Sequence, residues 1–99
     1  MNRASLRREH DLILVSGVLD FLTVGALLDQ GLALFGTDRE LILDLAEVER
    51  ANSAGLALLL EWLDVTQRRG QALRFRHLPE SLLAIAGMSH LEEHLPLVD

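Results

Sequence analysis

Two short stretches of the sequence contain residue types that could do chemistry. The first, residues 90–94, reads His-Leu-Glu-Glu-His and matches the H-x-x-E-H pattern of one class of zinc metalloproteases. A zinc site of this kind needs a helix long enough to bring both histidines to one face, and a third ligand from elsewhere. Because Pro96 ends any helix within a turn of His94, we expect exposed histidines and no metal site here.

The second stretch is Asn52-Ser53-Ala54-Gly55, which follows an apolar run and precedes a helical pattern. It lacks both glycine-rich phosphate loops, so it does not predict nucleotide binding. Ser53 also lacks the G-x-S-x-G elbow, and no histidine can be assigned as its base, so we do not expect nucleophilic catalysis. Two interpretations remain open. Ser53 or Asn52 caps the helix, or Ser53 is a regulated hydroxyl whose phosphate would meet free backbone N–H groups.

A strand and a helix must position this second stretch. Residues 41–45 form a nearly continuous apolar run, typical of a strand buried on both faces, and residues 47–51 are expected to form a turn. Residues 56–69 have helical spacing, and Gly70 stands where a left-handed C-terminal cap belongs. We expect the docking face to comprise Leu56, Leu59, Leu60 and Leu63, and a surplus apolar flank to comprise Leu58, Trp62 and Val65.

The rest of the chain alternates between strand and helix patterns. Strands are predicted at residues 3–8, 12–18 and 72–78, with Leu73, Phe75 and His77 on one face of the last strand. Helices are predicted at residues 23–34 and 79–86, the second ended by Gly87, with one further turn opened by a Ser89–Glu92 capping box. The expected fold is a single α/β domain over residues 1–99, with a mixed central sheet of about four strands and helices mainly on one face.

Composition limits the classes of partner. The chain has 99 residues, of which 49% are hydrophobic, a formal net charge of −6 and no lysine. Binding of nucleic acid is not expected, because it needs clustered basic residues. The absence of cysteine excludes disulfides and thiolate metal sites. Asp20 and Asp29 interrupt the apolar run that follows the basic residues 1–8, so the sequence predicts neither a membrane span nor a signal peptide, and we expect a cytoplasmic protein.

Two motifs resemble the STAS domain family, the fold of anti-sigma factor antagonists. Residues 16–20 (SGVLD) resemble its G-x-L-D signature, and residues 43–56 resemble its L-D-L-x-x-V-x-x-x-D-[ST]-[SAG]-G-L core, with the same spacing. The resemblance covers nearly the whole chain and implies a STAS-like fold. In the antagonists, the position of Ser53 is the phosphorylated serine, whereas the position of Asn52 is usually aspartate.

Residues 55–60 and the pair Leu95-Pro96 resemble one branch of the family more closely, the STAS subunits of bacterial Mla phospholipid ABC transporters. This resemblance implies a non-catalytic, cytoplasmic binding module without a cofactor. Its partner would be an MlaF-like ATPase subunit, which holds it at the inner membrane without membrane insertion. The alternative function is an anti-sigma factor antagonist regulated by phosphorylation of Ser53. A small hydrolase or metal enzyme is a third hypothesis, for which the sequence offers almost nothing.

The partner is expected to contact the surplus flank of the long helix and the loop before it. The predicted partner-binding residues are Asn52, Ser53, Ala54, Leu58, Trp62 and Val65. Trp62 has two interpretations, as an interface residue or as a core residue, and the sequence alone leaves both open.

Overall fold

A five-stranded sheet organises the fold, and its strands lie side by side in the order in which they occur in the chain. The computed structural model describes residues 3–98. The strands are β1 (Ala4–Glu9), β2 (Leu12–Leu19), β3 (Glu40–Ala51), β4 (Ala72–Arg76) and β5 (Leu97–Val98). β1 is antiparallel to β2, and every later pair is parallel. The mixed sheet predicted from the sequence is confirmed, and the short edge strand β5 is an addition to it.

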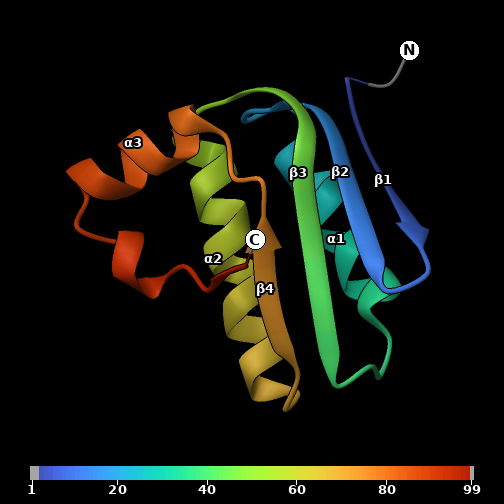
Figure 1. Cartoon of the computed structure of the whole chain (residues 1–99). Coiled ribbons are helices and arrows are strands. Elements are labelled where there is room, and N and C mark those ends of the chain that lie inside the picture. Colours follow the sequence, from blue (N-terminus) through green and yellow to red (C-terminus); the bar gives the residue numbers. More distant parts are fainter. Residues whose placement is uncertain (1–2, 99) are drawn as a thin grey trace.

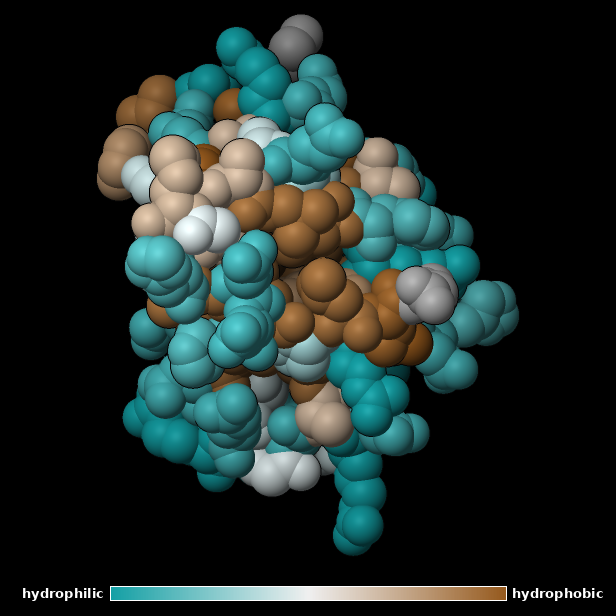
Figure 2. Space-filling view, turned by 60° about the vertical axis from the view of Figure 1, so that its left-hand side comes forward, coloured by the Kyte–Doolittle hydropathy of each residue, from teal (hydrophilic) through white to brown (hydrophobic). Residues whose placement is uncertain are grey.

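Two helices, α1 (Val24–Phe35) and α2 (Ser53–Arg68), lie beside each other behind the sheet in Figure 1. The alternation in β2 explains why they cover only one face. Ile13, Val15 and Leu19 are fully buried on that face, whereas Leu12 and Leu14 are partly exposed on the other. A third helix, α3 (Glu80–Met88), packs against α2, and a short 3₁₀ helix, η1 (Glu92–His94), follows it. Figure 2 brings this side of the molecule forward and shows a hydrophobic patch surrounded by hydrophilic surface. Within residues 3–98, no helix combines the length and the apolar character needed to cross a membrane.

The core between the two long helices is centred on Trp62, whose side chain is 0% exposed. Its indole Nε1 donates a hydrogen bond to the Leu28 carbonyl oxygen at 3.2 Å, and its ring meets Phe35 edge-on with 5.7 Å between centroids. Gly31 of α1 lies so close that a Cβ there would be 2.6 Å from the indole. α1 covers this side of α2, so the surplus apolar flank expected there is wrong for Leu58, which is 3% exposed, and of the two interpretations of Trp62 the structure selects the core residue.

β3 differs from its prediction in length and in polarity. It continues through Ala51, so the turn expected at residues 47–51 is wrong. The added residues pair with the end of β2, from Ser16 with Glu47 to Leu19 with Ala51, with one register shift just before Ser16 and a second between Gly17 and Val18. The prediction that β3 buries apolar side chains on both of its faces is also wrong. Asp44 lies between the inward-facing leucines in the sequence, and its side chain contacts His77 on the open face of the sheet.

The C-terminal third departs from the sequence pattern at three residues. His77 follows β4 with φ +57° and is exposed, so it does not continue the buried face of the strand. The second predicted helix does not end at Gly87, because α3 continues to Met88. The turn η1 begins after Leu91 without a side-chain cap, so the capping box predicted from Ser89 does not form.

Candidate functional site

The functional stretch predicted from the sequence lies where β2 and β3 end at the same edge of the sheet. The Asn52 N–H donates to the Leu19 carbonyl oxygen at 3.1 Å, which ties the two chain segments together. Gly55 completes the junction, because a Cβ there would lie 3.0 Å from the Leu19 Cβ and 3.3 Å from that of Ala51. The start of α2 therefore packs directly on the ends of both strands.

Asn52 is the residue that caps α2. Its side-chain Oδ1 accepts a hydrogen bond from the Ala54 N–H at 2.9 Å. Ser53 is the first residue of the helix and is exposed, and no hydrogen bond from its hydroxyl to another residue of the range 3–98 is present. Of the two caps considered, the structure selects Asn52, which leaves the Ser53 hydroxyl accessible at the helix N-terminus.

The loop between β2 and α1 presents two apolar side chains to solvent. Thr23 Oγ1 donates to the Val18 carbonyl oxygen at 2.8 Å, and the Leu22 N–H donates to Asp20 Oδ1 at 2.9 Å. These bonds fix the loop so that Phe21 and Leu22 point outward, with 76% and 81% of their surface exposed. These two residues are not among the binding residues predicted from the sequence. The sequence does contain a signal for them, because two apolar residues directly follow Asp20, the aspartate that ends the strand.

An apolar groove of about 390 Å³ runs from this loop between the outer sides of α1 and α2. Its lining comprises Phe21, Val24, Gly25, Leu28, Ala54, Ala57, Leu58 and Glu61. Ala54 and Leu58 are only 4% and 3% exposed and contribute to its floor, whereas Phe21 stands at its rim. The groove thus joins part of the predicted binding set to the exposed loop.

The six predicted binding residues fall into three groups. Asn52 and Ser53 are exposed at the start of α2, and Ala54 and Leu58 line the groove. Val65 is partly exposed, and Trp62 is fully buried behind the groove. Two of the six residues therefore line the groove, Asn52 and Ser53 directly precede Ala54 in the chain, and Trp62 is removed from the surface. Their contact with a partner stays a prediction.

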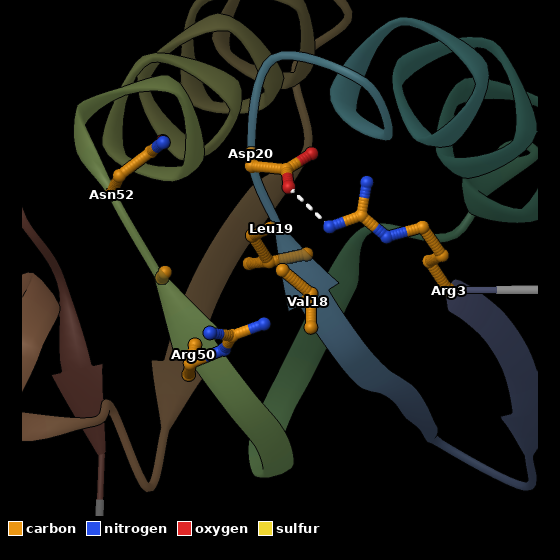
Figure 3. A pocket seen from close by; sticks show the side chains of 7 residues that line it. Arg3, Val18, Leu19, Asp20, Arg50 and Asn52 are labelled. Atoms are coloured by element: carbon orange, nitrogen blue, oxygen red, sulfur yellow. Dashed lines mark hydrogen bonds and ion pairs between the residues drawn. The ribbon is translucent and has the colours of Figure 1, made fainter.

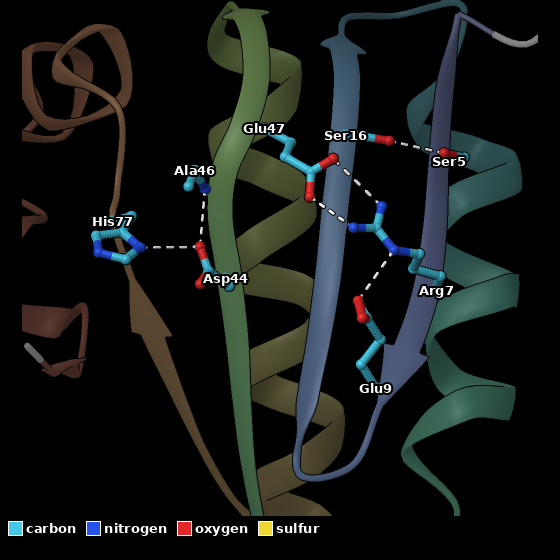
Figure 4. Close-up of polar contacts among 8 residues, drawn as sticks. All are labelled: Ser5, Arg7, Glu9, Ser16, Asp44, Ala46, Glu47 and His77. Carbon is cyan, nitrogen blue, oxygen red and sulfur yellow. Dashed lines mark hydrogen bonds and ion pairs between the residues drawn. The ribbon is translucent and has the colours of Figure 1, made fainter.

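A separate polar cluster occupies the open face of the sheet (Figure 4). Arg7 Nη2 lies 2.7 Å from Glu47 Oε2 across β2, and its hydrogen bond holds the pKa of Glu47 below the usual value. Burial alone would raise the pKa of Asp44, but the Ala46 N–H and His77 at 3.0 Å outweigh it, so the pKa lies below its usual value. The Arg7–Glu47 ion pair joins β1 to β3, and the Asp44–His77 contact joins β3 to the residue that follows β4, as in a structural network.

The histidines of the H-x-x-E-H pattern are both exposed, on either side of the start of η1. Over residues 3–98, no group of three or more His, Cys, Asp or Glu side chains is placed to hold a metal ion.

Comparisons with known proteins agree with this architecture. A family model described as the MlaB STAS domain matches residues 2–99. A chain in the structure of the Acinetobacter MlaFEDB complex in an ATP-bound conformation is 37% identical, with a TM-score of 0.76 over 88% of this chain and 93% of that chain. A search of curated proteins found no match.

Two anti-sigma factor antagonists share the fold at lower identity. The antagonist SpoIIAA in its unphosphorylated form is 13% identical, with a TM-score of 0.71 over 97% of this chain and 88% of that chain. An antagonist from Mycobacterium paratuberculosis is 21% identical, with a TM-score of 0.67 over 95% and 82%. These two likenesses concern the fold alone. Because the MlaB-type model spans residues 2–99 and the resemblance seen in the sequence is confirmed, the chain belongs to the STAS domain family.

Proposed function

We propose that this protein is a non-catalytic STAS subunit that binds the ATPase subunit of an Mla-type phospholipid ABC transporter. The observation that supports this proposal most strongly is the 37% identity to a chain of an MlaFEDB complex, over 88% of the present sequence. That chain belongs to a complex named MlaFEDB that was solved in an ATP-bound conformation. On this proposal the protein is cytoplasmic and is held at the inner membrane through its partner.

The surface that fits this role is the groove between α1 and α2 with the loop beside it. We define the docking surface as Phe21, Leu22, Val24, Leu28, Asn52, Ser53, Ala54, Ala57 and Leu58. Exposed apolar side chains that stand together on a soluble domain often mark protein interfaces. Phe21 is the expected anchor, because aromatic residues are enriched in the buried centre of interfaces, and its side chain is 76% exposed in the isolated chain.

The test is to identify the partner and then to reconstitute the pair. The tagged protein is used to capture partners from cells of its source, and the bound proteins are identified by mass spectrometry. The expected partner is an ABC-type ATPase that, once purified, forms a complex with the protein in size-exclusion chromatography. Failure of the purified ATPase to bind would contradict the proposal.

The exposure of Ser53 at the first position of α2 favours a second candidate function, that of a phosphorylation-regulated anti-sigma factor antagonist. The same capture experiment separates the two functions, because the antagonist's partner would be a kinase that binds a sigma factor. Recovery of such a kinase that phosphorylates Ser53, without an ABC ATPase, would select this alternative.

A further inference from the structure

A second hollow lies at the carboxyl ends of β2 and β3, outside the docking surface except for the shared residue Asn52. It has a volume of about 380 Å³ and is lined by Arg3, Val18, Leu19, Asp20, Arg50, Ala51 and Asn52. Figure 3 shows the Arg3 side chain reaching in from the N-terminal side and Arg50 from β3, with Val18 and Leu19 between them. Carboxyl ends of parallel strands are the edge of an α/β sheet at which ligands bind, and the volume falls within the range of small-molecule sites.

The backbone at the end of β2 allows Arg3 to approach it closely. The Val18 N–H donates to the Arg3 carbonyl oxygen at 2.8 Å. A Cβ at residue 17 would lie 2.1 Å from that oxygen, and Gly17 has φ +93°, so only glycine allows the approach. The Arg3 side chain then reaches Asp20, with 2.8 Å between Nη2 and Oδ2. The glycine of the G-x-L-D signature thus helps to form one wall of the hollow.

The hollow contains more positively charged donor groups than acidic groups to pair with them. Both carboxylate oxygens of Asp20 are already bound, one by Arg3 and the other by the Leu22 N–H. Arg50 has no hydrogen bond or ion pair with any residue in the range 3–98. The Asn52 Oδ1 accepts from Ala54, which leaves its amide N–H₂ as a further donor. The two arginines and Asp20 give a local charge of +1 in a chain whose net charge is −6.

We propose that this hollow binds the phosphate group of an organic phosphate. Guanidinium groups bind phosphate oxygens with strong, directional hydrogen bonds. Arg3, Arg50 and Asn52 line the hollow from the residue before β1, the end of β3 and the start of α2, and a lining from three elements suits a tetrahedral group with oxygens on several sides better than a planar carboxylate. Val18, Leu19 and Ala51 provide an apolar wall for the carbon part of the ligand. The phosphate ester is either a free metabolite or the headgroup of a phospholipid, and both present the same chemistry to the arginines.

The test follows backbone amide signals of the isotopically labelled full chain by NMR. The probes are inorganic phosphate, then sn-glycerol 3-phosphate, and finally phosphatidylglycerol vesicles in a flotation assay. We expect saturable shifts at Val18, Leu19 and Ala51, and tighter binding of glycerol 3-phosphate than of inorganic phosphate. Arg50→Gln should weaken binding at least about tenfold. Its matched control, Arg74→Gln, removes the same charge from an exposed position on β4 and should change affinity by less than about twofold.

The probes also distinguish the two sources of the ligand. If the protein binds glycerol 3-phosphate but does not float with the vesicles, the site is assigned to a free phosphate ester. If the wild type and Arg74→Gln float with the vesicles and Arg50→Gln does not, the site is assigned to a lipid headgroup. The proposal is overturned if no probe binds, or if both variants lose affinity equally. It does not depend on the ATPase, because every probe is added to the isolated chain.

Discussion

The helix pair α1–α2 places two large aromatic side chains in opposite environments. Trp62 lies in the inner seam of the pair, fully buried against Gly31, Phe35 and the Leu28 carbonyl oxygen. Phe21 lies at the outer groove of the same pair and is 76% exposed. The spacing of apolar residues left both interpretations of Trp62 open and did not indicate Phe21, whereas in the structure Trp62 is buried and Phe21 is exposed.

The difference shows that a wide apolar arc on one helix does not by itself indicate a partner protein. The arc of α2 exceeds what one sheet can cover, but α1 packs beside it and buries the excess. Phe21 is exposed for a different reason, because hydrogen bonds at Asp20 and Thr23 fix its loop on the surface. An apolar residue held outward by its own backbone is a stronger sign of an interface than one on a helix with several possible neighbours.

The largest effect expected in this comparison is that of Trp62→Ala. Removal of a fully buried indole leaves a cavity and an unpaired Leu28 carbonyl oxygen, at a cost of about 3–5 kcal/mol of folding stability. For a domain of this size, the melting temperature should fall by more than about 10 °C. Circular dichroism during heating measures it, with Phe21→Ala as the exposed aromatic control. A variant that melts within a few degrees of the wild type would refute the buried seam.

A smaller effect should follow from Gly31→Ala, which tests how closely the seam is packed. The added Cβ would lie 2.6 Å from an indole that is enclosed on all sides, and overpacking of this kind costs about 1–3 kcal/mol. Better helix propensity offsets roughly 1 kcal/mol of that cost at most. The matched control is Gly25→Ala in the same helix, where a Cβ meets nothing within 4 Å and stability should be unchanged or slightly raised. Equal melting temperatures for the two variants would indicate a loose seam.

Most of the fold could be predicted from the sequence because its helices have helical apolar spacing and three of its strands have either an apolar run or an alternating pattern. The errors lie where tertiary pairing overrides local pattern. Residues 47–51 have the polar composition of a turn, yet they extend β3 because the end of β2 is available as a parallel partner. The two-residue strand β5 has no periodic signal at all, and it forms only by pairing with Phe75 and Arg76.

The site was predictable only in part, for a related reason. Asn52 and Ser53 could be placed at a helix start from residue type and position, because capping is a local interaction. Whether Trp62 or Phe21 faces solvent depends on the packing of α1 against α2, about which the spacing within either helix contains no information. The arginines of the second hollow are 47 positions apart in the numbering, at 3 and 50, and only the pairing of strands brings them together.

A still smaller change in stability is expected for Ser53→Asp, which tests the open end of the docking surface. A negative charge at the first turn of α2 should stabilise the helix by about 0.3–1 kcal/mol, and Ser53→Ala should be nearly neutral because Asn52 is the cap. Affinity for the proposed ATPase partner should nevertheless fall in Ser53→Asp. The matched control is Ser81→Asp, which places the same charge in the first turn of α3. Equal affinities of Ser53→Asp and wild type, measured by calorimetry, would remove Ser53 from the docking surface.

The smallest effect on folding, and the clearest on binding, is expected for Phe21→Ser. Because 76% of the side chain is already exposed, its replacement should change folding stability by less than about 0.5 kcal/mol. If Phe21 anchors the partner, affinity for the ATPase should fall at least about tenfold, as for an aromatic residue at the centre of an interface. Met88 on α3 is 77% exposed and offers a matched control, since Met88→Ser removes an apolar side chain of equal exposure from outside the docking surface. Loss of binding in Phe21→Ser alone would place the partner on the groove between α1 and α2. Loss in Met88→Ser alone would instead move the interface to α3, and Phe21 would then be exposed without being an anchor.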